Sequence, residues 1–158
     1  MRQLRVYLDT SIFGGVFDKE FADSSSHFIE RAKTGEYKIL VSQSTLLELG
    51  NAPERVQKIL QEIPREHTEF IPFDEEVRAL ADSYIAAAVL GEARREDAHH
   101  IAAASVAGAD LMLSWNFKHI VRYDRIRKFN GVNALKGYSA LDIRSPLEVQ
   151  YGENEEGL

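Results

Sequence analysis

The chain has 158 residues, a length typical of one compact domain, and its 44% hydrophobic and 28% charged content is that of an ordinary globular protein. Cysteine is absent, which excludes disulfides and thiolate metal sites and fits a cytoplasmic location. No apolar run reaches the roughly 18 residues of a membrane span, and Asp9 interrupts the first one, so we expect neither a membrane segment nor a signal peptide.

The first third of the chain predicts a strand, a helix and a second strand. Residues 5–8 form a short run that contains a β-branched and an aromatic side chain and ends at Asp9, which predicts a strand followed by a loop. Residues 23–34 carry apolar side chains at helical spacing, and Gly35 behind them is a common helix terminator. The apolar run 38–42 predicts the second strand.

The next segment predicts two short helices and a third strand. Thr45 and Glu48 have the spacing of a capping box, in which two side chains bond backbone N–H groups where a helix begins. Pro53 is well placed in the first turn of another helix that runs to about Ile63. Residues 69–73 predict a strand at an irregular or edge position, because their proline cannot donate to a sheet.

Two further helices are predicted in the second half of the chain. Asp74 is expected to cap a helix over residues 74–90, and Asp97 is expected to cap a helix over about 97–107. The remaining strands are expected at 111–114 and 138–143. The first of these is apolar throughout, which suits a sheet covered on both faces.

Strands that alternate with helices predict an α/β fold. We expect a three-layer sandwich, with a mostly parallel central sheet of about five strands and helices on both faces. One domain should span residues 1–147, followed by an acidic, flexible tail over 148–158. The exposed parts of the first helices and of helix 74–90 are candidates for the surface of a homodimer.

Three carboxylates are predicted to meet at one edge of this sheet. In parallel α/β sheets, ligands bind beyond the carboxyl ends of the strands. Asp9 follows the first strand, Glu48 lies on the helix after the second, and Asp97 begins a helix that starts at the same edge. Asn116 follows the fourth strand there, whereas Asp110 lies at the opposite edge and is left out.

Each of these acids also has a structural explanation. Asp9 could be a turn residue, Glu48 part of the capping box, and Asp97 an N-cap. Together they suggest more, because unpaired carboxylates held close repel one another and are costly to desolvate. A divalent cation removes that cost, and oxygen ligands alone favour Mg²⁺ or Mn²⁺.

The adjacent histidines of EDAHHIAAA do not predict a zinc site. There is no pair of histidines four residues apart on a helix, and the other three lie in unrelated segments. His100 shares the buried helical face of Asp97, so we expect a packed histidine that supports the site, while His99 points outward. His119 could contact a phosphate or could be an ordinary surface residue.

The segment 118–128 is basic although the whole chain carries −6. It holds five basic residues against the single acid Asp124, namely Lys118, Arg122, Arg125, Arg127 and Lys128. This segment is either a solvated surface or a phosphate-binding patch. Trp115 and Phe117, just before it, could stack on a base of single-stranded RNA or could belong to the core.

Several stretches of the chain resemble the PIN-domain family, the fold of the VapC-type toxin ribonucleases. They are VYLDTSIF (6–13), STLLELGNA (44–52), EDAHHIAAA (96–104) and LMLSWNFKHI (111–120). The last of them, with GYSALDIRSPLEV (137–149), is similar to a subgroup that has a WNFKH signature. The resemblance covers nearly the whole chain.

The resemblance implies a metal-dependent endoribonuclease, with Mg²⁺ or Mn²⁺ held by Asp9, Glu48 and Asp97 and with an antitoxin protein as a possible partner. It also implies that Thr10 or Ser11 helps to order the site. Many PIN proteins carry a fourth acid in a T-x-D motif, whereas this chain has Asn116, which offers a carbonyl oxygen but no charge. A second metal would therefore be held more weakly. Residues expected to bind RNA phosphates are Lys118, His119, Arg122 and Arg125.

Three alternatives stay open. An aspartyl-nucleophile phosphatase has a second acid where this chain has Ser11, and the Gly14-Gly15 pair lacks the spacing of a dinucleotide-binding turn. The stronger alternative is a PIN fold that serves as a binding or scaffold module with little hydrolysis, which the amide at Asn116 supports.

Overall fold

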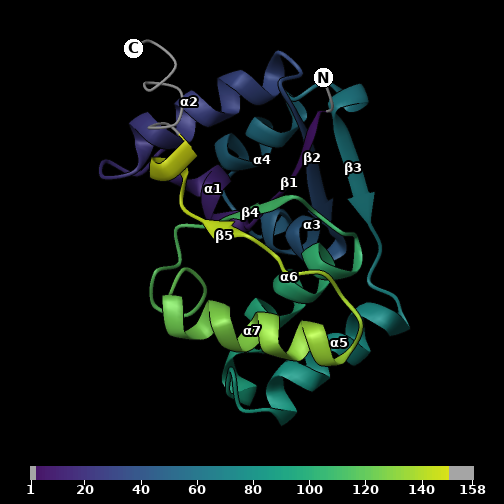
Figure 1. The fold of residues 1–158 in the computed structure, drawn as a ribbon. Coiled ribbons are helices and arrows are strands. Elements are labelled where there is room, and N and C mark those ends of the chain that lie inside the picture. The colour runs from purple at the N-terminus through teal and green to yellow at the C-terminus, as the bar shows by residue number, and fades with distance from the viewer. Residues whose placement is uncertain (1–2, 150–158) are drawn as a thin grey trace, which may run out of the picture.

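A computed structural model describes residues 3–149 and contains one five-stranded sheet in which every pairing is parallel (Figure 1). The strand order is β3-β2-β1-β4-β5. The strands are β1 (Leu4–Leu8), β2 (Tyr37–Ser42), β3 (Thr68–Ile71), β4 (Leu111–Leu113) and β5 (Ile143–Arg144). The expected edge position of β3 is confirmed, and Pro72 follows its last residue.

Helices connect the strands. They are α1 (Thr10–Gly15), α2 (Ala22–Lys33), α3 (Gln43–Gly50), α4 (Glu54–Gln61), α5 (Glu75–Ala86), α6 (Arg95–Val106) and α7 (Tyr123–Leu135), with the 3-10 turns η1 (Arg65–His67) and η2 (Glu92–Arg94). No helix within residues 3–149 is long and apolar enough to cross a membrane. The predicted tail lies outside the described residues from residue 150 onward, and residues 146–149 form a helical turn.

The alternation of side chains along the strands builds two cores, one on each face of the sheet. Val6 and Leu8 of β1 pack with α1, α2 and α4, whereas Tyr7 between them packs with α5, α6 and α7. Figure 1 shows α2 and α4 on one side of the sheet and α5, α6 and α7 on the other. The predicted three-layer α/β sandwich is confirmed.

Two helices were not predicted. The helix α1 is only six residues long and contains Gly14 and Gly15, so its sequence carries little helical signal. The helix α7 has a weak apolar pattern, and its stability comes from tertiary contacts. Its buried Asn133 accepts a hydrogen bond from Tyr84 at 2.5 Å and donates one to Ser105 at 2.9 Å.

The expected caps of α3 and α6 were wrong. The cap of α3 is Ser42, whose Oγ accepts a hydrogen bond from the Thr45 N–H, so Glu48 lies beyond the first turn. The helix α6 begins at Arg95, two residues before Asp97, and Asp97 is not its cap. The prediction for Asp74 is confirmed, since its Oδ1 accepts from the Val77 N–H at 3.0 Å.

Candidate active site

An open cleft of about 640 Å³ lies at the carboxyl ends of the strands, where an α/β sheet places its ligands. Asp9, Glu48 and Asp97 all line it, together with Asn116. Asp110 is at the opposite edge, as expected, where its Oδ2 accepts a hydrogen bond from the Arg5 N–H. The three acids come from segments that are far apart in sequence, and the parallel topology brings them to one edge.

Asp9 is the most buried of the three acids, with 6% of its surface exposed. Its Oδ2 accepts hydrogen bonds from the hydroxyls of Ser11 and Ser114, both at 2.8 Å. Asp9 precedes α1 but makes no side-chain capping bond, so it is not needed as a turn or cap residue. Ser11 also accepts the N–H of Trp115 at 3.0 Å, which ties the end of β4 to the start of α1.

Glu48 is held by His100, which is buried beneath the cleft floor. The Nε2 of His100 donates to Glu48 Oε1 at 2.5 Å and lies 3.7 Å from Asp9 Oδ1, while its Nδ1 lies 2.6 Å from the Tyr7 hydroxyl. Burial opposes the charge of this ring, but Tyr7, Glu48 and Asp9 outweigh burial and raise the pKa of His100 well above its ordinary value. His100 is therefore a buried residue in contact with two of the acids, and the expectation of a packed histidine is confirmed.

Glu48 and Asp97 have opposite pKa shifts. Burial by itself raises the pKa of Glu48, but the hydrogen bond and charge of His100 outweigh it and lower that pKa below the ordinary value. The pKa of Asp97 is raised, first by burial and then by the charge of Asp9, with Arg94 and His100 acting in the other direction. The protein therefore compensates the charge of Asp97 only in part.

The donor set fits a hard divalent cation. All candidate ligands are oxygens, and the hydroxyl of Thr10, which interacts with Glu48 and helps to lower the pKa of that acid, also lines the cleft. Among residues 3–149, no three histidine or acidic side chains are close enough to form a ready-made metal cage. Mg²⁺ does not require one, because it usually keeps several waters and takes only one or two protein carboxylates.

Asn116 lines the cleft but already has a structural role. Its Oδ1 accepts the backbone N–H of His119 at 2.9 Å, and its backbone oxygen accepts the N–H groups of Ile120 and Val121. The amide therefore shapes the turn after β4. The Oδ1 of Asn116 keeps one further lone pair that could accept a hydrogen bond from a ligand in the cleft.

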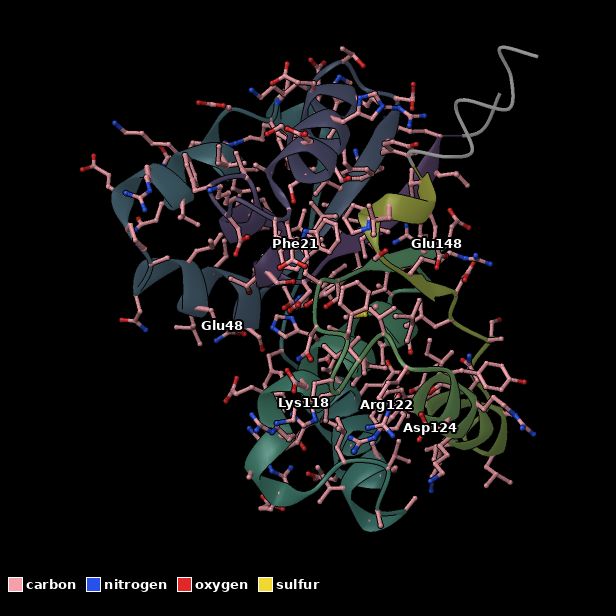
Figure 2. All side chains as sticks on the ribbon, turned by 90° about the vertical axis from the view of Figure 1, so that its left-hand side faces the viewer. Phe21, Glu48, Lys118, Arg122, Asp124 and Glu148 are labelled. Carbon is pink, nitrogen blue, oxygen red and sulfur yellow. The ribbon has the colours of Figure 1, made fainter. Side chains whose placement is uncertain are left out.

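The basic segment flanks this cleft without lining it. Figure 2 shows Lys118 and Arg122 below the level of Glu48. Arg122 forms a bidentate ion pair with Asp124 at 3.0 and 3.1 Å. Both ring nitrogens of His119 are buried and have no hydrogen-bond partner among residues 3–149, and burial and the surrounding cations lower the pKa of His119. These cations are Arg94, Arg125, Lys118 and Arg122.

The two aromatic residues of this region separate in the structure. Trp115 is a core residue, 6% exposed, and its Nε1 donates to Ser25 Oγ at 2.8 Å. Phe117 is 44% exposed. His99 was expected to point outward, but only 16% of its side chain is exposed, because it packs on Phe73 with ring centroids 4.6 Å apart.

Sequence reasoning missed five residues of the site, and one of them is Asp18, a fourth acid that lines the cleft. Ser114 anchors Asp9, Tyr7 contacts His100, Arg94 offsets the charge of Asp97, and Phe21 lines the cleft. Tyr7 and Ser114 did carry a signal, because each places a hydroxyl in an apolar strand run next to a site residue. Arg94 and Phe21 carried none, since only the fold brings them to the cleft.

Comparison with known proteins identifies the fold independently. The PIN domain family matches residues 6–125. The crystal structure of VapBC2 from Rickettsia felis bound to a DNA fragment from their promoter contains a chain that is 17% identical, with a TM-score of 0.55 over 89% of this chain and 98% of that one. A chain in the crystal structure of FitAcB from Neisseria gonorrhoeae is 13% identical, with a TM-score of 0.57 over 90% of this chain and 98% of that one. No curated protein matches.

Proposed function

Because the chain belongs to the PIN-domain family, we propose that it is an endoribonuclease that hydrolyses RNA phosphodiester bonds with Mg²⁺ or Mn²⁺. The observation that carries this proposal is the shared cleft of Asp9, Glu48 and Asp97. Neither Glu48 nor Asp97 caps a helix, and Asp9 makes no capping bond. Three acids that the fold does not need, facing one cleft, are best explained by a cation.

The residues of the cleft would have different roles in the reaction. A bound divalent ion activates a water molecule and offsets charge on the phosphate. Asp9, fixed by two serine hydroxyls, would be the rigid ligand, and Asp97 the ligand whose repulsion the ion relieves. Glu48, bonded to His100, would orient a water molecule in the cleft. Lys118, Arg122 and Arg125 would bind flanking phosphates, with His119 beside them.

We also propose that the protein is the toxin of a toxin–antitoxin pair. The resemblance to VapC-type ribonucleases supports this, as does the likeness of the fold to chains of VapBC2 and FitAcB. An antitoxin would inhibit the enzyme by inserting a basic side chain, such as arginine, into the acidic cleft. Charge supports this mode, because Asp97 lies among the charges of Asp9 and Glu48.

A binding or scaffold module is the second candidate. Two observations favour it: Asn116 adds no fourth charge and is already bonded to His119, and no three-acid cage forms among residues 3–149. A scaffold would bind RNA or protein through the basic segment 118–128 and the exposed Phe117 without cleaving RNA. Cleavage assays separate the two functions directly.

The decisive experiment is cleavage of a mixed RNA pool with Mg²⁺, with Mn²⁺ and with EDTA. We expect the wild type to cleave only with metal, and Asp9→Ala and Asp97→Ala to lose at least about a hundredfold in rate. Glu75→Gln is the matched control, because Glu75 is a highly exposed acid on α5. Equal cleavage by all four proteins would indicate a contaminating nuclease, and binding without cleavage would favour the scaffold.

A further inference from the structure

Three aromatic rings gather beside the acidic cleft, and one of them is locked in place. Trp115 donates through Nε1 to Ser25 and lies against Gly15, where an added Cβ would come within 2.8 Å of its Nε1. Phe21 lies almost parallel to Trp115, with ring centroids 4.2 Å apart and planes inclined by 17°. Trp115 is thus a fixed surface on which Phe21 is stacked.

The outer rings are accessible. Phe21 is only half-buried and lines the cleft together with Trp115. Phe117 is 44% exposed and stands at an angle, with its centroid 6.1 Å from that of Trp115 and 6.5 Å from that of Phe21. A preformed pair of rings with a third as a side wall offers a planar ligand a rigid surface for stacking.

Cations and carboxylates flank these rings. Lys118 follows Phe117 directly in sequence, and the cleft that Phe21 lines also contains the three acids. Figure 2 shows Phe21 above and Lys118 below the level of Glu48. Phe117 and Lys118, adjacent in sequence, thus offer an aromatic ring and a cation, which match the two parts of a nucleotide, its base and its phosphate.

We propose that Phe21 and Phe117 form a subsite for one unpaired nucleobase next to the phosphate held at Lys118. This inference rests on the proposed function and narrows its substrate class to single-stranded RNA or loops. A base inside a duplex has both faces covered by its neighbours, so it cannot stack here. An apolar peptide side chain would also cover the rings, but it would not use the adjacent cation.

The test uses full-length Asp97→Asn protein in EDTA, so that RNA binds without being cleaved. The probe is a short single-stranded oligouridylate that contains one 2-aminopurine, whose fluorescence falls when it stacks on an aromatic ring. We expect quenching on binding, and we expect Phe117→Leu to weaken binding about tenfold and to remove the quenching. Phe117→Trp should restore both, because it keeps an aromatic face.

Two controls isolate the role of the base. Phe70→Leu changes another exposed phenylalanine, 52% exposed on β3, and should leave binding unchanged. The same oligonucleotide with an abasic residue in place of 2-aminopurine should bind equally well to the Asp97→Asn protein with Phe117 and to the Asp97→Asn protein that also carries Phe117→Leu. Phe21→Leu should repeat the Phe117→Leu result, and Phe117→Leu stands alone if Phe21→Leu fails to fold.

The outcomes distinguish the subsite from the nuclease. Base-dependent binding without cleavage by the wild type would keep the subsite and reject the nuclease. Cleavage by the wild type, combined with unchanged RNA affinity in both phenylalanine variants, would keep the nuclease and overturn the subsite. If the phenylalanine variants lost as much affinity for the abasic oligonucleotide as for the 2-aminopurine one, the subsite would also be overturned, because the rings would then act through protein packing.

Discussion

Two serine hydroxyls decide the orientation of the Asp9 carboxylate. Ser11 follows it on α1, and Ser114 ends the β4 run on the neighbouring strand, so two elements converge on one oxygen. Hydrogen bonds to a charged group are stronger than neutral ones, so the two hydroxyls hold this carboxylate firmly in one orientation. The second oxygen faces His100 at 3.7 Å and lies at the cleft.

Ser114→Ala should therefore weaken metal binding without unfolding the protein. We expect Mn²⁺ affinity to fall by about 10- to 100-fold, as is typical when a group that orients a metal ligand is removed. Isothermal titration calorimetry measures the change, and Ser114→Thr should retain most of the affinity. Ser83→Ala, which alters an exposed hydroxyl on α5, is the control. Unchanged affinity in Ser114→Ala would show that Asp9 does not hold the ion.

The raised pKa of Asp97 predicts that its charge destabilises the metal-free protein. A carboxyl whose folded pKa lies above its unfolded pKa favours folding below the unfolded value, and this benefit is lost as pH rises through the folded pKa. Burial and Asp9 are the main causes of the shift. At neutral pH, ionised Asp97 thus opposes folding unless a cation is bound.

Asp97→Asn should stabilise the protein in EDTA at pH 7 by roughly 0.5–1 kcal/mol, a small value because solvent screens this half-exposed group. The advantage over the wild type should disappear as the pH falls toward the ordinary value of 3.8. With Mn²⁺ the wild type should become the more stable of the two proteins, because metal binding stabilises only the wild type. Urea unfolding checks both signs. A loss of stability in EDTA at pH 7 would mean that Arg94 compensates the charge fully.

At the scale of elements, the short helix α1 is fixed by close packing rather than by helical propensity. Gly15 faces α2 and Trp115, and an added Cβ would lie 2.5 Å from Ser25 Oγ. Gly14, its neighbour on the same helix, has nothing within 4 Å of the same position. Of these two glycines, only Gly15 occupies a position where a larger side chain would clash with its neighbours, so Gly14 serves as its matched control.

Gly15→Ala should destabilise the protein by about 1–3 kcal/mol through overpacking, because α1 or Trp115 must shift. Gly14→Ala should be neutral or stabilising by up to about 1 kcal/mol, since alanine is the better helix former. Chemical denaturation gives both values, and tryptophan fluorescence reports the displacement of Trp115, the only tryptophan in the chain. Similar effects from the two substitutions would contradict the packing argument.

At the scale of the whole molecule, charge is unevenly distributed. The chain carries −6, yet Lys118, Arg122 and Arg125 lie close enough to His119 to lower its pKa together with Arg94. An acidic surface disfavours nonspecific contact with nucleic acid, so RNA binding should depend on the basic segment 118–128. Within the basic segment, Arg122 is already paired with Asp124, whereas no residue between 3 and 149 forms an ion pair with the exposed Lys118.

Lys118→Ala should therefore reduce the dependence of RNA affinity on salt more than Arg122→Ala does. Removing one phosphate contact lowers the slope of log K against log salt by about 0.7 for a single strand. Arg122→Ala should lower it by less, because binding must first break the pair with Asp124. Lys136→Ala, at the far end of α7, is the control. Equal slopes in all proteins would assign the basic segment to a solvated surface without a role in binding.

Much of the architecture was readable from the sequence, and the failures have physical causes. The alternation of strands with the helices α2 to α6 follows from hydrophobic periodicity, which is a local property, and the edge position of β3 follows from its proline. The predicted last strand 138–143 is only Ile143–Arg144 in the structure, because pairing with β4 determines its extent. The helix α7 was missed because tertiary contacts of Asn133 and Phe129 replace a strong amphipathic pattern.

By itself, the sequence determined that Asp9, Glu48 and Asp97 would reach one sheet edge, because parallel strands must all end on the same side. Only the tertiary structure decided which groups hold them: Ser114 and His100 lie 105 and 52 residues away from the acids they contact. It also decided that Trp115 faces the core while Phe117 faces solvent. Such partners depend on how distant elements pack in three dimensions, and local patterns of polarity do not encode that packing.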